Sequence, residues 1–262
     1  MVRLKEVSVH PTALVTGAAR GIGRQIAVSL AREGYAIAVV DTDFDGYREF
    51  DEAAGSVVDE LREIGVPTIA VEASTTDVEA MQELGARIHQ DWSRLDALVC
   101  NAGGGSGGFA DNTAATIDLS ALDDVLRRNL HGTITTVQAA LPALRQATNP
   151  AIVTMGSLTG VVANPQGGYA HYGITKAAVM HYTRYLANEL TPEGIRVNCV
   201  APGLISTGRL RVRLSEQPER EKEIADRLGT PDEVAAAVRY LLSPATTHMS
   251  GQVLQLWPPD VR

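Results

Sequence analysis

Tyr172 and Lys176 lie four residues apart in the stretch Tyr-Gly-Ile-Thr-Lys, and Ser157 precedes them in the chain. If this stretch is helical, the two side chains share a face, with Cβ atoms about 5–6 Å apart. A lysine ammonium at that distance favours the phenolate form of the tyrosine, because a nearby positive charge stabilises the anion. Lowering a tyrosine pKa from about 10 to about 7 takes roughly 4 kcal/mol of differential interaction, which a desolvated site can supply. The pair therefore indicates proton transfer near neutral pH; the alternative is an ordinary amphipathic helix with a core tyrosine and a solvated lysine.

The composition of the whole chain limits the classes of protein to which these residues can belong. Its 262 residues, 45% of them apolar, suit one large α/β domain covering residues 1–262. A formal charge of −8 argues against a nucleic-acid partner or an acidic membrane surface. The N-terminal segment lacks the apolar run of a signal peptide, and no apolar stretch approaches the ~18 residues that span a bilayer. Cys100 and Cys199 are interpreted as small buried hydrophobic residues, not as a disulfide or a metal site, so we expect a cytoplasmic protein without a metal.

A glycine-rich turn follows the first apolar run of the chain. Ala13–Thr16 leads into Gly17, Gly21 and Gly23, and a helical pattern then continues to about Gly34. A strand, a glycine turn and a helix start place backbone N–H groups and the positive end of a helix dipole at one point, which is a pyrophosphate site. The spacing is G-x-x-x-G-x-G and not the general G-x-G-x-x-G, so a plain tight turn is the alternative.

The next apolar run ends at Asp41, twenty residues after Gly21. An acidic residue there can accept hydrogen bonds from the ribose hydroxyls of an adenosine and repels a 2′-phosphate. Asp43 and Asp45 follow closely, and this acidic group favours NAD(H). Arg20 in the glycine turn is a candidate phosphate contact and keeps NADP(H) open as an alternative. A helix or turn cap is the structural alternative for Asp41.

Short apolar runs alternate with amphipathic patterns along most of the chain. This alternation predicts a parallel, doubly wound sheet flanked by helices on both faces. Ligands in such sheets bind at the carboxyl ends of the strands, where the glycine-rich segments fall. One long helix is expected over 119–147, with a kink at Pro142. The expected strands are 13–16, 35–40, 66–71, 95–100, 151–155, 194–200 and 251–256.

Several further motifs stand in a fixed order around the tyrosine and the lysine. They are Thr16-Gly-Ala-Ala-Arg-Gly-Ile-Gly23, Asn101-Ala-Gly103, Asn129, Ser157, Tyr172-x-x-x-Lys176, Asn198 and Pro202-Gly203-x-x-x-Thr207. Through them the chain resembles the short-chain dehydrogenase/reductase family, in the branch with a TGxxxGIG loop, over nearly its whole length. The resemblance implies a Rossmann-like single domain with a seven-stranded parallel sheet, NAD(P)-dependent oxidoreductase activity and usually a homotetramer.

The resemblance also implies the roles of four catalytic residues. Tyr172 would be the acid/base for the reacting oxygen, and Lys176 would bind the nicotinamide ribose and depress the tyrosine pKa. Ser157 would position the reacting oxygen. Asn129 would hold a water that links Lys176 to solvent. These roles agree with the physics, because a tyrosinate matched to the working pH removes the hydroxyl proton as hydride leaves.

The cofactor would lie along the glycine loop and the ends of the other strands. The resemblance places the pyrophosphate at the glycine loop, the adenosine ribose at Asp41 and the nicotinamide carboxamide at Ile205 and Thr207. Ser74 stands where the family commonly has an aspartate facing the adenine, and Asn101 would lie along the adenosine half. The full candidate set is Gly17, Arg20, Gly21, Ile22, Gly23, Asp41, Ser74, Asn101, Ala102, Gly103, Tyr172, Lys176, Pro202, Gly203, Ile205 and Thr207.

Three functions remain open at this point. The leading hypothesis is an NAD(H)-dependent oxidoreductase that interconverts a secondary alcohol and a ketone, both small molecules. An NADPH-dependent 3-oxoacyl reductase of the fatty-acid type has a similar pattern, although Asp41 counts against it. A dinucleotide-binding sensor or scaffold without turnover is the third.

The substrate side of the site is expected under a mobile lid at about 204–228, where the family places one. This stretch is highly charged, and Arg209 and Arg213 would share a helical face. An anionic substrate is one hypothesis for these arginines. Solvated lid arginines are the alternative.

Overall fold

Seven short strands form one parallel sheet in the computed structural model, which describes residues 10–50, 55–215, 219, 222 and 224–257. The order across the sheet is β3-β2-β1-β4-β5-β6-β7. The predicted doubly wound parallel sheet is thus confirmed, with strand bounds within a few residues of those expected. The strands are β1 (Thr12–Thr16), β2 (Ala36–Asp41), β3 (Thr68–Glu72), β4 (Ala97–Cys100), β5 (Ala151–Met155), β6 (Arg196–Pro202) and β7 (Val253–Leu256).

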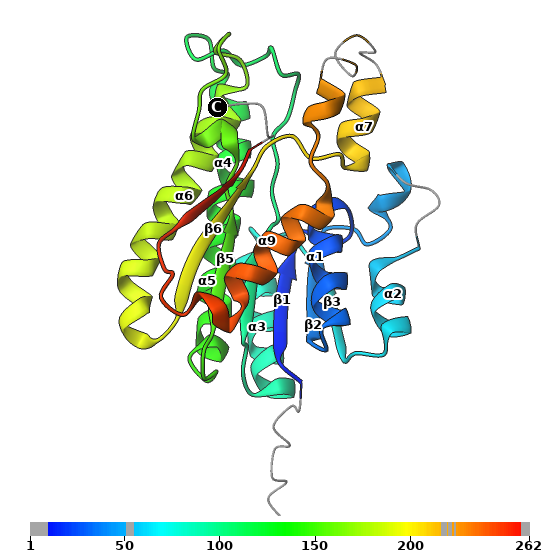
Figure 1. The fold of residues 1–262 in the computed structure, drawn as a ribbon, viewed down its shortest axis with the longest axis vertical. Helices are drawn as coiled ribbons and strands as arrows, with labels where there is room; N and C mark the ends of the chain where they lie inside the picture. Colours follow the sequence, from blue (N-terminus) through cyan, green and yellow to red (C-terminus); the bar gives the residue numbers. More distant parts are fainter. Residues whose placement is uncertain (1–9, 51–54, 216–218, 220–221, 223, 258–262) are drawn as a thin grey trace, which may run out of the picture.

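Helices cover both faces of the sheet, because alternate residues of each strand point to opposite sides. In β1, Ala13 and Val15 enter one hydrophobic core and Leu14 enters the other. Figure 1 shows α1 and α9 in front of the sheet and α3 behind it. The first core is closed by α1 (Gly21–Arg32), α2 (Val57–Ile64) and α9 (Pro231–Leu242), and the second by α3 (Val78–Trp92), α5 (Gly132–Leu144) and α6 (Ala170–Leu190).

The helix expected over 119–147 is interrupted in the structure. It consists of α4 (Leu119–Leu126), one π-helical turn at Arg127–His131, and α5. Pro142 lies in the last turn of α5, which ends at Leu144, so the long helix is interrupted at the π turn and ends before residue 147; the kink expected at Pro142 stays a prediction. A π turn inserts an extra residue into the helix and is frequent at functional sites. Here it contains the predicted site residue Asn129.

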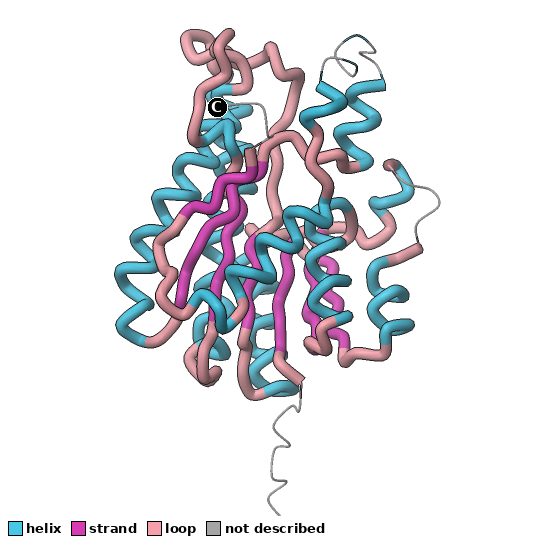
Figure 2. Tube along the Cα trace, viewed as in Figure 1, coloured by secondary structure: helices cyan, strands magenta, loops and turns pink. Residues whose placement is uncertain are grey.

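The long connections gather at the carboxyl ends of the strands. Figure 2 shows these loops together at the upper end of the sheet, beside the short helix α7 (Gly208–Ser215). Neighbouring strands β1 and β4 lead out of the sheet in opposite directions, toward β2 and β5, which creates the crevice where ligands bind in such folds. Short helical turns complete the connections at Gly46–Glu49, Leu158–Gly160, Thr191–Glu193, Ala225–Arg227 and Pro244–Thr246. Within the described ranges no helix is both long and apolar enough to cross a membrane.

Candidate active site

A cleft of about 970 Å³ opens at the carboxyl ends of the strands. It is lined by residues from the glycine loop, the ends of β2 and β4, the N-terminal part of α6 and the segment after β6. Every predicted site residue except Asn129 lines it: Gly17, Arg20, Gly21, Ile22, Gly23, Asp41, Ser74, Asn101, Ala102, Gly103, Ser157, Tyr172, Lys176, Pro202, Gly203, Ile205 and Thr207. The folded chain therefore brings together motifs that lie far apart in the sequence, from Gly17 to Thr207.

The glycine loop is held against the end of β4 by close packing and hydrogen bonds. Gly17 has a φ of +65°, and a Cβ there would lie 2.8 Å from the Cα of Ala102. A Cβ on Gly23 would overlap the carbonyl oxygen of Gly17. The Asn101 side-chain amide donates to the carbonyl oxygens of Thr16 and Gly17, both at 3.0 Å. The Asn101 side chain thus fixes the shape of the loop.

The N-terminus of α1 faces the cleft without a side-chain cap. Its N-cap residue, Arg20, makes no capping hydrogen bond, and the first turn contains no acidic residue. The first backbone N–H groups of a helix have no acceptor within the helix, and the helix dipole adds positive potential there. This end of α1 is therefore suited to bind a phosphate group. A cleft of this volume, lined from the end of β2 to the segment after β6, is large enough for an extended dinucleotide.

Asp41 lies at the end of β2 with its carboxylate against the glycine loop. Its Oδ2 accepts the Ala19 N–H at 2.9 Å, and its Oδ1 accepts the Thr42 N–H at 2.8 Å. Arg20 points to a different part of the chain: its Nη1 donates to the Gly46 carbonyl oxygen at 2.9 Å, and its guanidinium stacks on the Phe50 ring at 4.7 Å. Arg20 thus lines the cleft while its charged group contacts the turn after β2. Ser74 forms a local turn with Thr76, whose N–H it accepts at 3.2 Å.

Tyr172 and Lys176 share a face of α6, as their spacing predicts. Lys176 is only 4% exposed, and its Nζ donates to the Met155 carbonyl oxygen at 2.7 Å, at the end of β5. The same Nζ lies 5.8 Å from the centroid of the Tyr172 ring. Tyr172 is partly buried and lines the cleft. The lysine is thus anchored to the sheet, and the tyrosine is presented to the cleft.

The two titratable groups are shifted mainly by burial. Burial raises the pKa of Tyr172 to about 12, while a hydrogen bond with Ser157 and the charge of Arg209 act in the opposite direction. Burial lowers the pKa of Lys176 to about 8. The expectation that Lys176 depresses the pKa of Tyr172 was wrong for the chain by itself: the Tyr172 pKa is raised, and Lys176 is not among the groups that lower it. The lysine ammonium is turned toward the Met155 carbonyl, and the desolvation of the phenolate outweighs the favourable charges.

Ser157 follows β5 and lies within hydrogen-bonding reach of Tyr172. It caps the turn Leu158–Gly160, where its Oγ accepts the Thr159 hydroxyl at 2.9 Å and the Thr159 N–H at 3.3 Å. These two donors direct the Ser157 oxygen and leave its own proton for an acceptor in the cleft.

Asn129 lies behind the cleft wall instead of lining it. Its side chain is 1% exposed, donates to the Thr175 hydroxyl at 2.8 Å, and accepts the Gly104 N–H at 2.7 Å. Thr175 in turn donates to the Tyr172 carbonyl oxygen at 2.9 Å. Asn129 therefore connects α6 to the loop after β4. The expected role of Asn129, holding a water that links Lys176 to solvent, stays a prediction.

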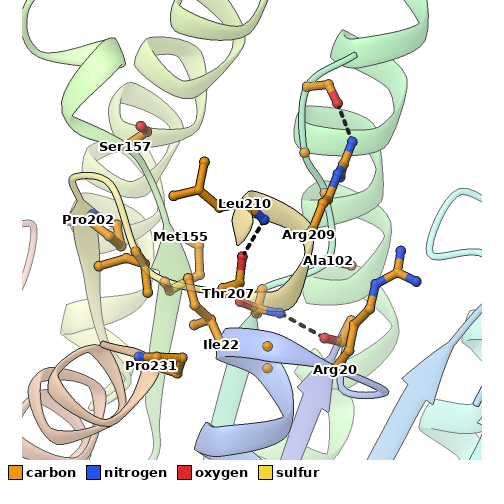
Figure 3. Close-up of a pocket in the computed structure, with 18 of the residues that line it drawn as sticks. Arg20, Ile22, Ala102, Met155, Ser157, Pro202, Thr207, Arg209, Leu210 and Pro231 are labelled. Carbon is orange, nitrogen blue, oxygen red and sulfur yellow. Dashed lines mark hydrogen bonds between the residues drawn. The ribbon is translucent and has the colours of Figure 1, made fainter. Parts of the chain in front are cut away.

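The segment after β6 closes the cleft on the other side. Thr207 accepts the Leu210 N–H at 3.4 Å at the start of α7, and Ile205 is 8% exposed. Figure 3 shows Arg209 reaching from α7 to the loop after β4, where its Nη2 donates to the Gly105 carbonyl oxygen at 2.8 Å. The second lid arginine of the anionic-substrate hypothesis, Arg213, has a side chain that lies outside the described residues. Among those that are described, no cluster of His, Cys, Asp and Glu is arranged to hold a metal ion.

One part of the site had no counterpart in the sequence-based prediction. The rings of Phe109 and Tyr169 also line the cleft, and the Tyr169 ring centroid lies 5.1 Å from that of Tyr172 and 5.3 Å from that of Phe109. The only sequence signal was an aromatic residue between the glycine pair at 167–168 and Tyr172. His171, next to Tyr172, is fully buried instead, with its Nε2 3.1 Å from the Ser106 carbonyl oxygen.

Comparisons with known proteins show which proteins this chain is similar to. A family model described as Enoyl-(Acyl carrier protein) reductase matches residues 17–256. A cyclohexanol dehydrogenase from Rhodococcus sp. (strain TK6) is 43% identical over 252 residues, covering 92% of this chain and 93% of that protein. A 3-oxoacyl-(acyl-carrier-protein) reductase from Staphylococcus aureus (strain N315) is 36% identical over 248 residues, covering 94% of this chain and 96% of that protein.

Solved structures show the same architecture. A 7 alpha-hydroxysteroid dehydrogenase complexed with NADH and 7-oxo glycochenodeoxycholic acid superimposes with a TM-score of 0.83 at 28% identity, covering 96% of this chain and 94% of that one. An actinorhodin polyketide ketoreductase with NADPH superimposes with a TM-score of 0.81 at 28% identity, covering 95% of this chain and 96% of that one. The chain belongs to the short-chain dehydrogenase/reductase family, as its motifs predict. It is an oxidoreductase with a Rossmann-like fold, in a family whose members use a nicotinamide dinucleotide.

Proposed function

We propose that this protein transfers a hydride between NAD(H) and a secondary alcohol or its ketone. The observation that carries the proposal is the arrangement at the cleft: Tyr172, Ser157 and the buried Lys176 line the same space as the uncapped end of α1. Tyr172, which can transfer a proton, and the N-terminus of α1, which can bind a phosphate, thus line the same cleft. The greater identity to a cyclohexanol dehydrogenase than to a 3-oxoacyl reductase supports an alcohol or ketone as the substrate.

The cofactor would extend from Asp41 across the glycine loop to the end of β6. The first turn of α1 would hold the pyrophosphate, Asp41 the adenosine ribose, and Lys176 the nicotinamide ribose. When bound, the nicotinamide ring supplies the donor or acceptor of the hydride. The remaining contacts would come from Gly17, Arg20, Ile22, Ser74, Asn101, Ala102, Gly103, Pro202, Gly203, Ile205 and Thr207, all of which line the cleft.

Tyr172 would take the hydroxyl proton of an alcohol substrate or return a proton to the ketone oxygen. Ser157 would donate its hydroxyl proton to the same oxygen and hold it beside the tyrosine. Because burial raises the pKa of Tyr172, activity near neutral pH requires further positive charge close to the phenol. Among the chain's own charges, that of Arg209 acts to lower the pKa of Tyr172 and provides part of it.

The preference for NAD(H) rests on the end of β2. The Asp41 carboxylate lines the cleft, where it would accept ribose hydroxyls and repel a 2′-phosphate. Arg20, the competing phosphate ligand, already directs its guanidinium at the Gly46 carbonyl and the Phe50 ring. Asp41→Ala should therefore lower kcat/KM with NAD⁺ and raise it with NADP⁺. A wild-type enzyme that prefers NADP⁺ would contradict the assignment and favour the 3-oxoacyl reductase alternative.

The direct test is a panel of secondary alcohols and ketones assayed with both cofactors in both directions. The wild type should oxidise unhindered secondary alcohols with NAD⁺. Tyr172→Phe should bind NADH as the wild type does, measured by the fluorescence of the dinucleotide, while turnover falls by about 10²–10⁴-fold. Equal turnover by Tyr172→Phe would refute the assigned role. Reduction confined to 3-oxoacyl thioesters would refute the substrate class.

We further infer that residues 204–228 form a lid over the substrate and that the protein assembles as a homotetramer; positions 216–218, 220–221 and 223 of this segment lie outside the described residues. The lid is supported by α7, whose Arg209 and Leu210 line the cleft opposite Tyr172. Assembly is supported by large apolar side chains on the outer face of α6, where Ile174 is 50% and Tyr185 67% exposed in one chain. Light scattering of the purified protein tests the tetramer, and protection of α7 from hydrogen exchange on adding NADH tests the lid.

A further inference from the structure

An aromatic wall stands beside the reacting group of the cleft. It consists of Phe109, Tyr169 and Tyr172, whose neighbouring ring centroids lie 5.3 and 5.1 Å apart. They come from two segments, with Phe109 on the loop after β4 and the two tyrosines at the start of α6. Tyr169 lies in the middle of the wall, and its ring adjoins that of Tyr172, the group that would contact the substrate oxygen.

The backbone of Tyr169 adopts a conformation that tyrosine rarely takes. Its φ of 60° and ψ of 24° are left-handed, and it is the N-cap residue of α6. Such a conformation is unfavourable in a residue other than glycine and persists only when the surroundings enforce it. Here the Tyr169 N–H donates to the Asp111 carbonyl oxygen at 2.7 Å, and the Ala170 N–H donates to that of Asn112 at 3.1 Å. The two bonds join the wall's loop to the start of α6.

The hydroxyl end of Tyr169 is enclosed as well. It lies against Gly105, where even one added methyl group would overlap the phenol oxygen. The carbonyl of Gly105 in turn accepts the Arg209 guanidinium at 2.8 Å, which connects the loop to α7. The ring is only 8% exposed and is thus held at its backbone, its face and its hydroxyl end. A larger substrate cannot displace it without breaking these contacts.

We propose that Tyr169 is the specificity-determining residue of this site: it limits the ring size of the substrate, so that a compact alicyclic secondary alcohol is accepted and a fused-ring alcohol is excluded. The inference rests on the proposed function and adds the substrate class to it. A rigid ring fixed at three points discriminates by shape, because the cost of moving it falls on the larger substrate alone.

The test uses Tyr169→Asn, because asparagine tolerates the left-handed conformation while it removes the ring. Tyr169→Phe is the matched control that keeps the ring. The measured quantity is the ratio of kcat/KM for cyclohexanol to that for decahydro-2-naphthol, with NAD⁺ saturating. The ratio should fall about tenfold or more in Tyr169→Asn and stay within about twofold of the wild type in Tyr169→Phe. NADH binding should match the wild type in both variants, since the cofactor contacts are elsewhere.

Two outcomes would overturn this inference and leave the proposed function intact. One is an unchanged ratio in Tyr169→Asn while the wild type oxidises cyclohexanol. The other is an equal fall of the ratio in Tyr169→Phe, which would assign the effect to the hydroxyl and not to the ring. If Tyr169→Asn fails to fold, Tyr169→Gly removes the same ring at no cost in backbone strain and must give the same fall. Oxidation of neither alcohol by the wild type would refute the proposed function and this inference with it.

Discussion

The Lys176 ammonium donates a hydrogen bond to the Met155 carbonyl oxygen at 2.7 Å, which holds this cation at the end of the central strand β5. This bond fixes the lysine within 5.8 Å of the Tyr172 ring centroid at the junction of α6 and the sheet. It satisfies one of the three ammonium protons and leaves the others for the cleft that Lys176 lines. The lysine can therefore hold a ligand without moving its own charge.

Replacing Lys176 by methionine should change how stability depends on pH. Burial lowers the lysine pKa to about 8 from its usual 10.5, so between these values the unfolded chain holds a proton that the folded chain has lost. Stability therefore rises with pH across this window in the wild type, by about 2–3 kcal/mol from pH 8 to pH 10, relative to Lys176→Met. Urea unfolding of both proteins at pH 7, 8, 9 and 10 measures the difference. A constant difference over the series would contradict a lowered lysine pKa.

Replacing Arg209 by glutamine should move the pH profile of alcohol oxidation. The guanidinium acts to lower the pKa of Tyr172, and its removal therefore raises that pKa. Oxidation needs the deprotonated tyrosine, so the rising limb of kcat/KM against pH should shift to higher pH. Arg184→Gln is the control, since Arg184 is exposed on the same helix as Tyr172 and does not line the cleft. A profile that does not move in Arg209→Gln would show that this charge is screened from the phenol.

A methyl group at Gly23 should abolish cofactor binding. A Cβ there would overlap the Gly17 carbonyl oxygen and the Asn101 amide, so the glycine loop would have to move away from the start of α1. NADH titration of Gly23→Ala by fluorescence should show no saturable binding. Gly55→Ala provides the comparison, because a Cβ at Gly55 meets no atom within 4 Å and its φ is not left-handed. NADH affinity of Gly23→Ala close to that of the wild type would place the dinucleotide elsewhere.

The fold and most of the site could be predicted because their signals are local. Alternating apolar runs specify the parallel strands, and the glycine turn after β1 fixes where the first helix begins, so the cleft collects nearly every residue that the motifs marked. That Tyr172 and Lys176 share a face of α6 could be predicted from their spacing of four residues alone. These properties depend on neighbours in sequence, which a pattern records.

The remaining features depend on contacts between distant segments. The pKa of Tyr172 is set by burial, which no spacing reveals, and the Lys176 bond to Met155 depends on how α6 docks on β5. Tyr169 was missed because its place depends on the glycine-rich loop after β4, which has no periodicity. The π turn at Asn129 was missed because a helical pattern does not show an inserted residue.

Asn129→Ala should loosen the loop after β4 more than it affects cofactor binding. The buried amide accepts the Gly104 N–H at 2.7 Å and donates to the Thr175 hydroxyl at 2.8 Å, and alanine leaves both groups without these partners. Leaving buried polar groups unpaired costs about 1–3 kcal/mol of unfolding free energy. Hydrogen exchange of the Gly104 amide should accelerate, and urea unfolding should show the loss. If Asn129 acted only by holding a water beside Lys176, kcat would fall in Asn129→Ala while the Gly104 amide stayed as protected as in the wild type, so the two measurements decide between a structural brace and a proton path.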